Sequence, residues 1–80
     1  MVEVIFDSHF KKSVKKIRDA TLKEKIKKQI AKIIENPEIG KPMRFGRKGT
    51  RELYVAPYRL SYTFESDKII LLALYHKDEQ

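Results

Sequence analysis

The sequence predicts an α+β fold in which two N-terminal helices pack on one face of a mostly antiparallel sheet. Lysine-rich segments with apolar residues at helical spacing fill most of the first half of the chain, and apolar, strand-like runs fill the second half after Pro37. Helices and strands segregated along a chain in this way are typical of α+β proteins. We expect a single domain over residues 1–80, with the element order β-α-α-β-β-β-β.

The first two elements are a short strand and an amphipathic helix. Residues 2–6 show the alternation of a strand. In residues 7–19, Asp7 or Ser8 is a suitable helix cap. Apolar residues then recur on one helical face, at Phe10, Val14 and Ile17.

The second helix follows after a tight join. Residues 20–37 predict a helix that Thr21 caps and Pro37 ends. Its apolar stripe consists of Leu22, Ile26, Ile30, Ile33 and Ile34. The two helices are expected to run antiparallel.

Four more strands are predicted, a short edge strand and three longer ones, at residues 43–45, 51–56, 58–65 and 68–76. Alternation in the fourth strand of the fold turns its aromatic and aliphatic side chains toward the helices, so Arg59 projects from the open face. The same argument places Glu52 and Tyr54 on the open face beside Arg59. The last strand is apolar on both faces, so alternation does not place His76.

The antiparallel hairpin formed by residues 58–77 brings Arg59 and the segment Tyr75-His76-Lys77 to the same end of the sheet. Arginine binds phosphoryl groups, histidine transfers protons near neutral pH, and tyrosine stacks on unpaired bases. This combination suits cleavage of an RNA phosphodiester. The alternative is structural: a solvated His76, and an Arg59 that forms a cross-strand ion pair with Glu52.

The charge of the chain favours a polyanionic partner. Eighteen Lys and Arg against eleven Asp and Glu give a net charge of +7, which suits nucleic acid, a ribonucleoprotein surface or an acidic protein; a merely solvated lysine surface is the alternative. No cysteine is present, and His9 and His76 lack metal-ligand spacing, so neither metal nor cofactor is expected. With no signal peptide and no apolar run of membrane-spanning length, the expected location is the cytoplasm.

The segment "YRLSYTF", a short turn and an apolar strand ending in His76 together resemble the RelE/ParE toxin superfamily of type II toxin–antitoxin modules. The resemblance covers nearly the whole chain. It implies a RelE-like fold and the activity of an mRNA interferase, a ribosome-dependent endoribonuclease that inhibits translation. It also implies a cognate RelB-like antitoxin with an acidic, partly disordered segment, bound in a heteromeric complex.

The resemblance further implies roles for single residues. Arg59 stands where RelE-like toxins carry an arginine that stabilises the transition state. Tyr75-His76-Lys77 resembles the Tyr-His-Tyr tail of YoeB-like toxins, in which the histidine is the general acid. The expected catalytic set is therefore Arg59, His76, Lys77 and Glu52.

Two departures from the family leave the general base open. Met43 follows Gly40-Lys41-Pro42 where YoeB-like toxins carry a glutamate, and Glu52 and Tyr54 occupy the positions of two lysines of RelE-like toxins. Glu52 could serve as the base. The other possibility is His76, with positive charge supplied by Lys77 or Arg51.

On this interpretation the toxin binds RNA and the ribosome through basic and aromatic residues, at Arg44, Arg47, Lys48, Arg51, Tyr54 and Tyr75. Two alternatives remain. ParE-like members of the superfamily inhibit DNA gyrase, and a small basic domain could also bind RNA or the ribosome without catalysis.

Overall fold

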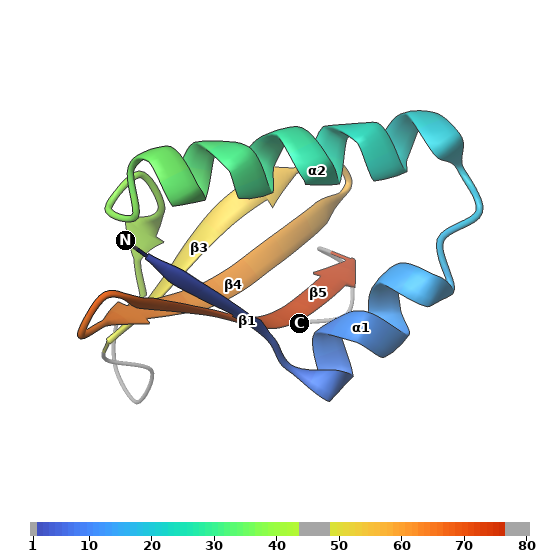
Figure 1. Cartoon of the computed structure of the whole chain (residues 1–80). Helices are drawn as coiled ribbons and strands as arrows, with labels where there is room; N and C mark the ends of the chain where they lie inside the picture. Colours follow the sequence, from blue (N-terminus) through green and yellow to red (C-terminus); the bar gives the residue numbers. More distant parts are fainter. Residues whose placement is uncertain (1, 44–48, 77–80) are drawn as a thin grey trace.

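The computed structural model describes residues 2–43 and 49–76 and has the predicted element order (Figure 1). The elements are β1 (Glu3–Phe6), α1 (Ser8–Lys15), α2 (Ala20–Glu35), β2 (Lys41–Pro42), β3 (Thr50–Val55), β4 (Tyr58–Glu65) and β5 (Lys68–His76). The α+β class is confirmed.

In the described residues the sheet has five strands, in the order β1-β5-β4-β3-β2. β1 pairs in parallel with β5, with Val4 opposite Ile69, and the other three pairings are antiparallel. Ser66 and Asp67 make the β4–β5 turn with φ of 51° and 61°, the left-handed conformation that a two-residue hairpin turn requires.

Both helices begin at an aspartate. Asp7 caps α1, where its carboxylate accepts a hydrogen bond from the His9 N–H at 2.9 Å. Asp19 caps α2 and accepts from the N–H groups of Thr21 and Leu22. The prediction that Thr21 caps the second helix was wrong. Asp19 occupies the extended backbone position from which a side chain reaches the first free N–H groups.

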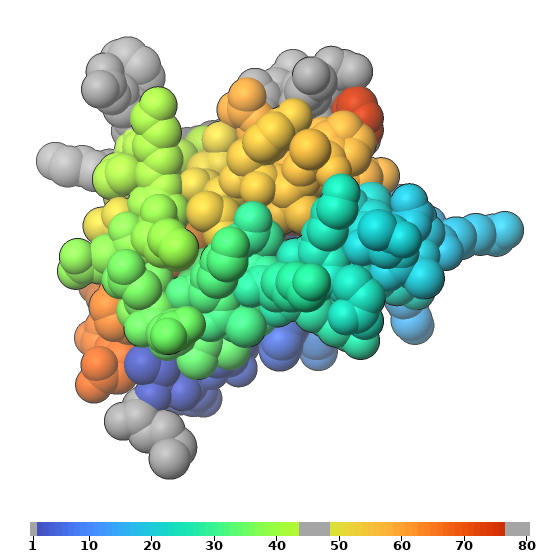
Figure 2. All heavy atoms as spheres, turned by 90° about the horizontal axis from the view of Figure 1, so that it is seen from above, coloured from blue at the N-terminus to red at the C-terminus, as the bar shows by residue number. Residues whose placement is uncertain are grey.

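One hydrophobic core joins both helices to the sheet. Figure 2 looks down on α2, which covers the middle of this face, between the strand residues on one side and the N-terminal segment on the other. The predicted core face of β4 is confirmed, because Leu60 and Tyr62 are fully buried. The buried core residues are Phe10, Ile17, Ile26, Ile33, Val55, Leu60, Tyr62, Ile69, Leu71 and Leu74.

The loop after α2 is fastened to the sheet by Tyr62 and Arg51. The Tyr62 hydroxyl donates to the Pro37 carbonyl at 2.8 Å and accepts from the Gly40 N–H at 2.9 Å. Arg51 Nη1 donates to the carbonyls of Glu38 and Gly40 at 3.0 and 2.8 Å. Burial raises the pKa of the Tyr62 phenol above its ordinary value of 10.0, so the protonated donor is favoured.

The edge strand that follows this loop begins earlier in the sequence than predicted. We expected the strand at residues 43–45, but β2 is Lys41–Pro42, with Lys41 opposite Glu52. The hydrogen bond from Arg51 to the Gly40 carbonyl holds the chain beside β3 directly before Lys41. The Met43 N–H then donates to the Thr50 carbonyl. The rest of the expected strand lies outside the described residues.

Candidate functional site

The open face of the sheet, away from the helix-side core, displays aligned rows of side chains. In one row, Tyr54 of β3, Arg59 of β4 and Tyr75 of β5 are direct register partners. The next row contains Glu52, Ser61 and Ala73. The sequence prediction that Glu52 and Tyr54 lie on the same face as Arg59 is confirmed.

Glu52 is the centre of a polar cluster. Its Oε1 accepts a hydrogen bond from Arg59 Nη1 at 3.0 Å, and its Oε2 accepts one from the Tyr75 hydroxyl. The ion pair is partly shielded, with side-chain exposures of 37% for Arg59 and 18% for Glu52. A carboxylate, a guanidinium and a phenol therefore converge from three neighbouring strands. The cross-strand ion pair anticipated from the sequence is present.

His76 lies at the same end of the sheet but on its other face. It is the register partner of Tyr58, and the two rings make an edge-on contact with centroids 5.4 Å apart. Tyr75, one residue earlier, is the partner of Arg59. The structure thus brings His76 to the strand end shared with Arg59, as expected, but does not place the two side chains on one face.

A bulge in β5 decides which tail residue joins Arg59. The register shifts between Ser61 and Tyr62, so that Leu72 is the extra residue of β5. Without this shift, strict alternation from buried Leu71 would have turned Tyr75 to the core and His76 to the open face. The bulge reverses that order.

The expected RNA-binding residues are distributed over both faces. Tyr54 is 52% exposed beside Arg59 on the open face. Arg51 is the register partner of core residue Tyr62, and its guanidinium bonds the loop after α2. The remaining predicted basic residues, Arg44, Arg47, Lys48 and Lys77, lie outside the described residues.

Two features of the open face were missed by sequence reasoning. Lys41, opposite Glu52, belongs to the same face as the cluster. A hollow of about 300 Å³ lies next to the cluster, lined by Met43, Thr50, Ser61, Leu72, Ala73 and Tyr75. The sequence signal for the hollow was the pair of small residues Ser61 and Ala73, but these two residues face each other only because of the bulge in β5.

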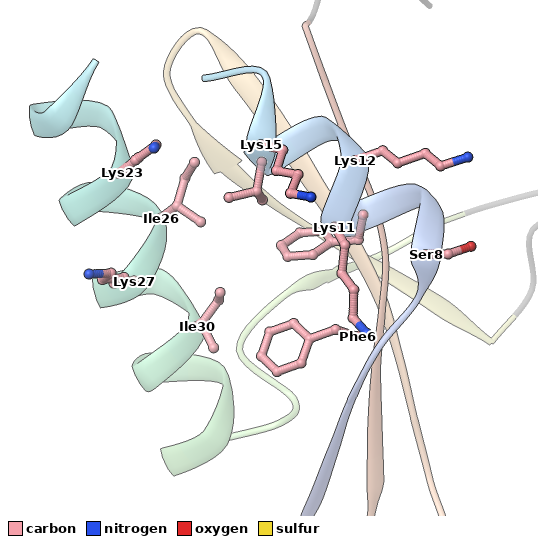
Figure 3. A pocket seen from close by; sticks show the side chains of 11 residues that line it. Phe6, Ser8, Lys11, Lys12, Lys15, Lys23, Ile26, Lys27 and Ile30 are labelled. Carbon is pink, nitrogen blue, oxygen red and sulfur yellow. The ribbon is translucent and has the colours of Figure 1, made fainter. Parts of the chain in front are cut away.

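A larger groove, of about 940 Å³, separates the two helices. In Figure 3, Ile26 and Ile30 point from α2 toward Phe6 and α1. No acidic residue is among those described as lining the groove. Its lysines are Lys11, Lys12, Lys15, Lys23 and Lys27. The helices therefore leave an apolar channel with a cationic border between them.

Within residues 2–43 and 49–76, no cluster of three histidine or acidic side chains is arranged to hold a metal ion. Neither helix in that part of the chain has the length and apolar character needed to cross a bilayer.

Comparison with known proteins connects this fold to bacterial toxins. Residues 4–80 match the family model described as the ParE toxin of the type II toxin-antitoxin system parDE. No curated protein matches the chain.

Several solved structures share the fold. The YoeB/ParE toxin from Agrobacterium tumefaciens superposes with a TM-score of 0.84 at 15% identity, covering 94% of this chain and 98% of that one. A chain of the intact E. coli RelBE toxin-antitoxin complex gives 0.79 at 21%, covering 95% and 96%. YafQ from E. coli gives 0.78 at 21%, covering 99% and 97%. These similarities show a RelE-like fold.

Proposed function

Because this chain belongs to the ParE toxin family of type II toxin–antitoxin systems, we propose that it is a cytoplasmic toxin that cleaves mRNA on the ribosome and so inhibits translation. The observation that supports a nuclease is the convergence of Glu52, Arg59 and Tyr75 on the open face. A base and a phosphate-binding cation side by side are two of the groups that transesterification of RNA uses, and the third is an acid. The RelBE, YoeB and YafQ structures share this fold.

In the proposed reaction the RNA 2′-hydroxyl attacks the adjacent phosphorus. Glu52 accepts the hydroxyl proton while Arg59, which holds Glu52 at 3.0 Å, stabilises the charge that develops on the phosphoryl oxygens. The bond from phosphorus to the 5′-oxygen breaks. The products are a 2′,3′-cyclic phosphate and a 5′-hydroxyl, and the proton that Glu52 gained is balanced by one that an acid gives to the leaving oxygen.

We assign that acid to His76, with Lys77 beside it in sequence supplying positive charge. Since His76 packs against Tyr58 on the far face, its imidazole must turn around the end of β5 to reach the leaving oxygen beside Arg59. In-line attack requires a bent substrate strand, and the ribosome supplies that geometry. Tyr54 and Tyr75 would contact the bases, and the basic residues of segment 44–51 the ribosomal RNA.

The test is primer extension on an mRNA in a reconstituted translation reaction. We expect Arg59→Ala and Glu52→Gln each to slow ribosome-dependent cleavage by roughly 10²-fold or more. Glu65→Gln is the matched control, because it removes an exposed carboxylate at the opposite end of β4. Faster cleavage by Glu52→Gln would show that Glu52 only restrains Arg59. Unchanged cleavage by His76→Ala would remove His76 from the mechanism.

The family description itself favours a second candidate, inhibition of DNA gyrase, because the family model is that of the ParE toxin. A gyrase inhibitor needs no reactive cluster, and the Glu52–Arg59 pair would then be structural. It predicts DNA damage in cells and loss of supercoiling in vitro, with no mRNA cuts. A non-catalytic RNA- or ribosome-binding module predicts neither cuts nor loss of supercoiling.

We further propose that the groove between α1 and α2 receives a RelB-like antitoxin. An apolar floor with a lysine border complements an amphipathic helix that carries acidic residues beside its apolar face. Neutralisation by co-expressed antitoxin should fail in the charge reversal Lys23→Glu/Lys27→Glu. The pair Lys25→Glu/Lys28→Glu is the control: these lysines are exposed on α2 outside the groove, and the change in net charge is the same. Equal neutralisation of both variants would place the antitoxin elsewhere.

A further inference from the structure

We propose that the hollow on the open face is a nucleobase subsite, which seats one unpaired base of a single-stranded RNA next to the phosphate bound by Arg59. The proposal rests on the proposed action on RNA and adds the place where the RNA is read. The hollow and the Glu52–Arg59–Tyr75 cluster share Tyr75.

The floor of the hollow is built from two small residues that face each other across β4 and β5. Ser61 and Ala73 are direct register partners, and Ser61 is only 7% exposed. Glu52 stands in the same row, but its carboxylate reaches into the next row, to Arg59 and Tyr75. The space above the two small side chains is therefore left to solvent or a ligand.

The walls have the composition of a base-binding site. Leu72 lines the hollow because the bulge makes it the extra residue of β5, and Met43 and Tyr75 complete the apolar and aromatic lining. Thr50 and Ser61 supply hydroxyl groups that can donate to or accept from a base edge. Unpaired RNA bases are recognised by this combination of a stacking surface and polar edge contacts. The volume of about 300 Å³ is at the lower limit for small-ligand pockets.

The spacing suits a nucleotide. Arg59 and Ser61 are two residues apart on β4, which corresponds to about 7 Å along the strand, so the phosphate of the nucleotide whose base occupies the hollow can reach the guanidinium. Lys41 stands on the opposite side of Glu52 in the row that contains the floor. The cations on this face and the net charge of +7 favour a polyanionic strand over a neutral aromatic ligand.

The experiment measures binding, not cleavage. The probe is a short 2′-O-methyl RNA, which has no 2′-hydroxyl to attack, and a single abasic position is moved along it. Binding is followed by fluorescence anisotropy at low salt, where phosphate contacts are strongest. For the wild type we expect one abasic position to weaken binding roughly 5- to 150-fold, the range measured when a stacked base loses its partner. The other positions should have smaller effects.

Ala73→Leu should abolish that positional effect by filling the hollow, while leaving the affinity of the abasic probe close to that of the wild type. Thr63→Val is the matched control. Thr63 lies on the same face, two residues after Ser61, but does not line the hollow, so this variant should keep the effect. Leu72→Ala removes one apolar wall of the hollow instead of filling the hollow, and it should reduce the positional effect. Circular dichroism establishes that each variant is folded.

Three results would overturn the subsite: no sensitive position in the wild type, a sensitive position that survives in Ala73→Leu, or no RNA binding at all. Failure of the nuclease proposal is distinguishable. Base-dependent binding that Ala73→Leu abolishes, combined with no ribosome-dependent cleavage, would keep the subsite and reject only the nuclease.

Discussion

The hydroxyl of Tyr62 offers a direct measurement of what holds the β2 edge in place. Tyr62→Phe removes one oxygen atom from a fully buried side chain. The Gly40 N–H loses its acceptor and the Pro37 carbonyl loses its donor. The ring itself keeps its packing, so the change isolates the two hydrogen bonds.

The expected cost follows from those two bonds. A hydrogen bond contributes a net of about 0.5–1.5 kcal/mol, and a buried group left unsatisfied costs about 1–3 kcal/mol. Gly40 is buried, whereas Pro37 is partly exposed and can recover a bond to water. We therefore expect a loss of about 2–3 kcal/mol in the free energy of unfolding. This is a large share of the roughly 4–12 kcal/mol typical of a domain of this size.

The assay is urea unfolding followed by circular dichroism, with thermal melting in parallel. The expected loss corresponds to a decrease in Tm of roughly 8–24 °C. Tyr54→Phe is the control, because it removes the same atom from a residue that is 52% exposed. If Tyr62→Phe were as stable as Tyr54→Phe, within about 0.5 kcal/mol, the Tyr62 hydroxyl would not anchor the loop after α2.

Three further predictions concern stability. Gly40→Ala should destabilise the fold by about 2 kcal/mol or more, because its Cβ would lie 2.6 Å from Tyr62 Oη and 2.8 Å from Cε1; urea unfolding measures it. Because the pKa of Tyr62 is raised in the folded state, the stability that its hydroxyl contributes is intact below the ordinary pKa and is lost as pH rises above about 10. Thermal melts between pH 8 and 11 should show a steeper alkaline loss of stability for the wild type than for Tyr62→Phe. Asp19→Ala should cost about 1 kcal/mol, measurable by urea unfolding, whereas Thr21→Ala should cost less.

Strand alternation made much of the open face predictable. The side chains of β4 alternate cleanly between polar and apolar, so the position of Arg59 and its proximity to Glu52 followed from the period of two. The two helices were equally predictable from the sequence, because their apolar residues recur at helical spacing.

The position of His76 was beyond that reasoning. β5 is apolar on both faces, and its Leu71-Leu72 pair gives no sign of which residue is extra. A bulge is fixed by packing against neighbouring strands, and one residue of shift exchanges Tyr75 and His76 between the faces. The position of β2 was missed for a similar reason, since it depends on long-range hydrogen bonds in which Gly40 accepts from Arg51 and donates to Tyr62.

The parallel pairing of β1 with β5 also has a consequence for synthesis of the chain. The first strand described, β1, has its sheet partner in the last strand described, β5, which supplies Ile69, Leu71 and Leu74 to the core. The nascent chain therefore cannot close its sheet until β5 has emerged. Such distant pairings slow folding, because the chain loses the entropy of loop closure before it forms the contacts that offset this loss. A partner that binds the β4–β5 hairpin can therefore act only after β5 has emerged.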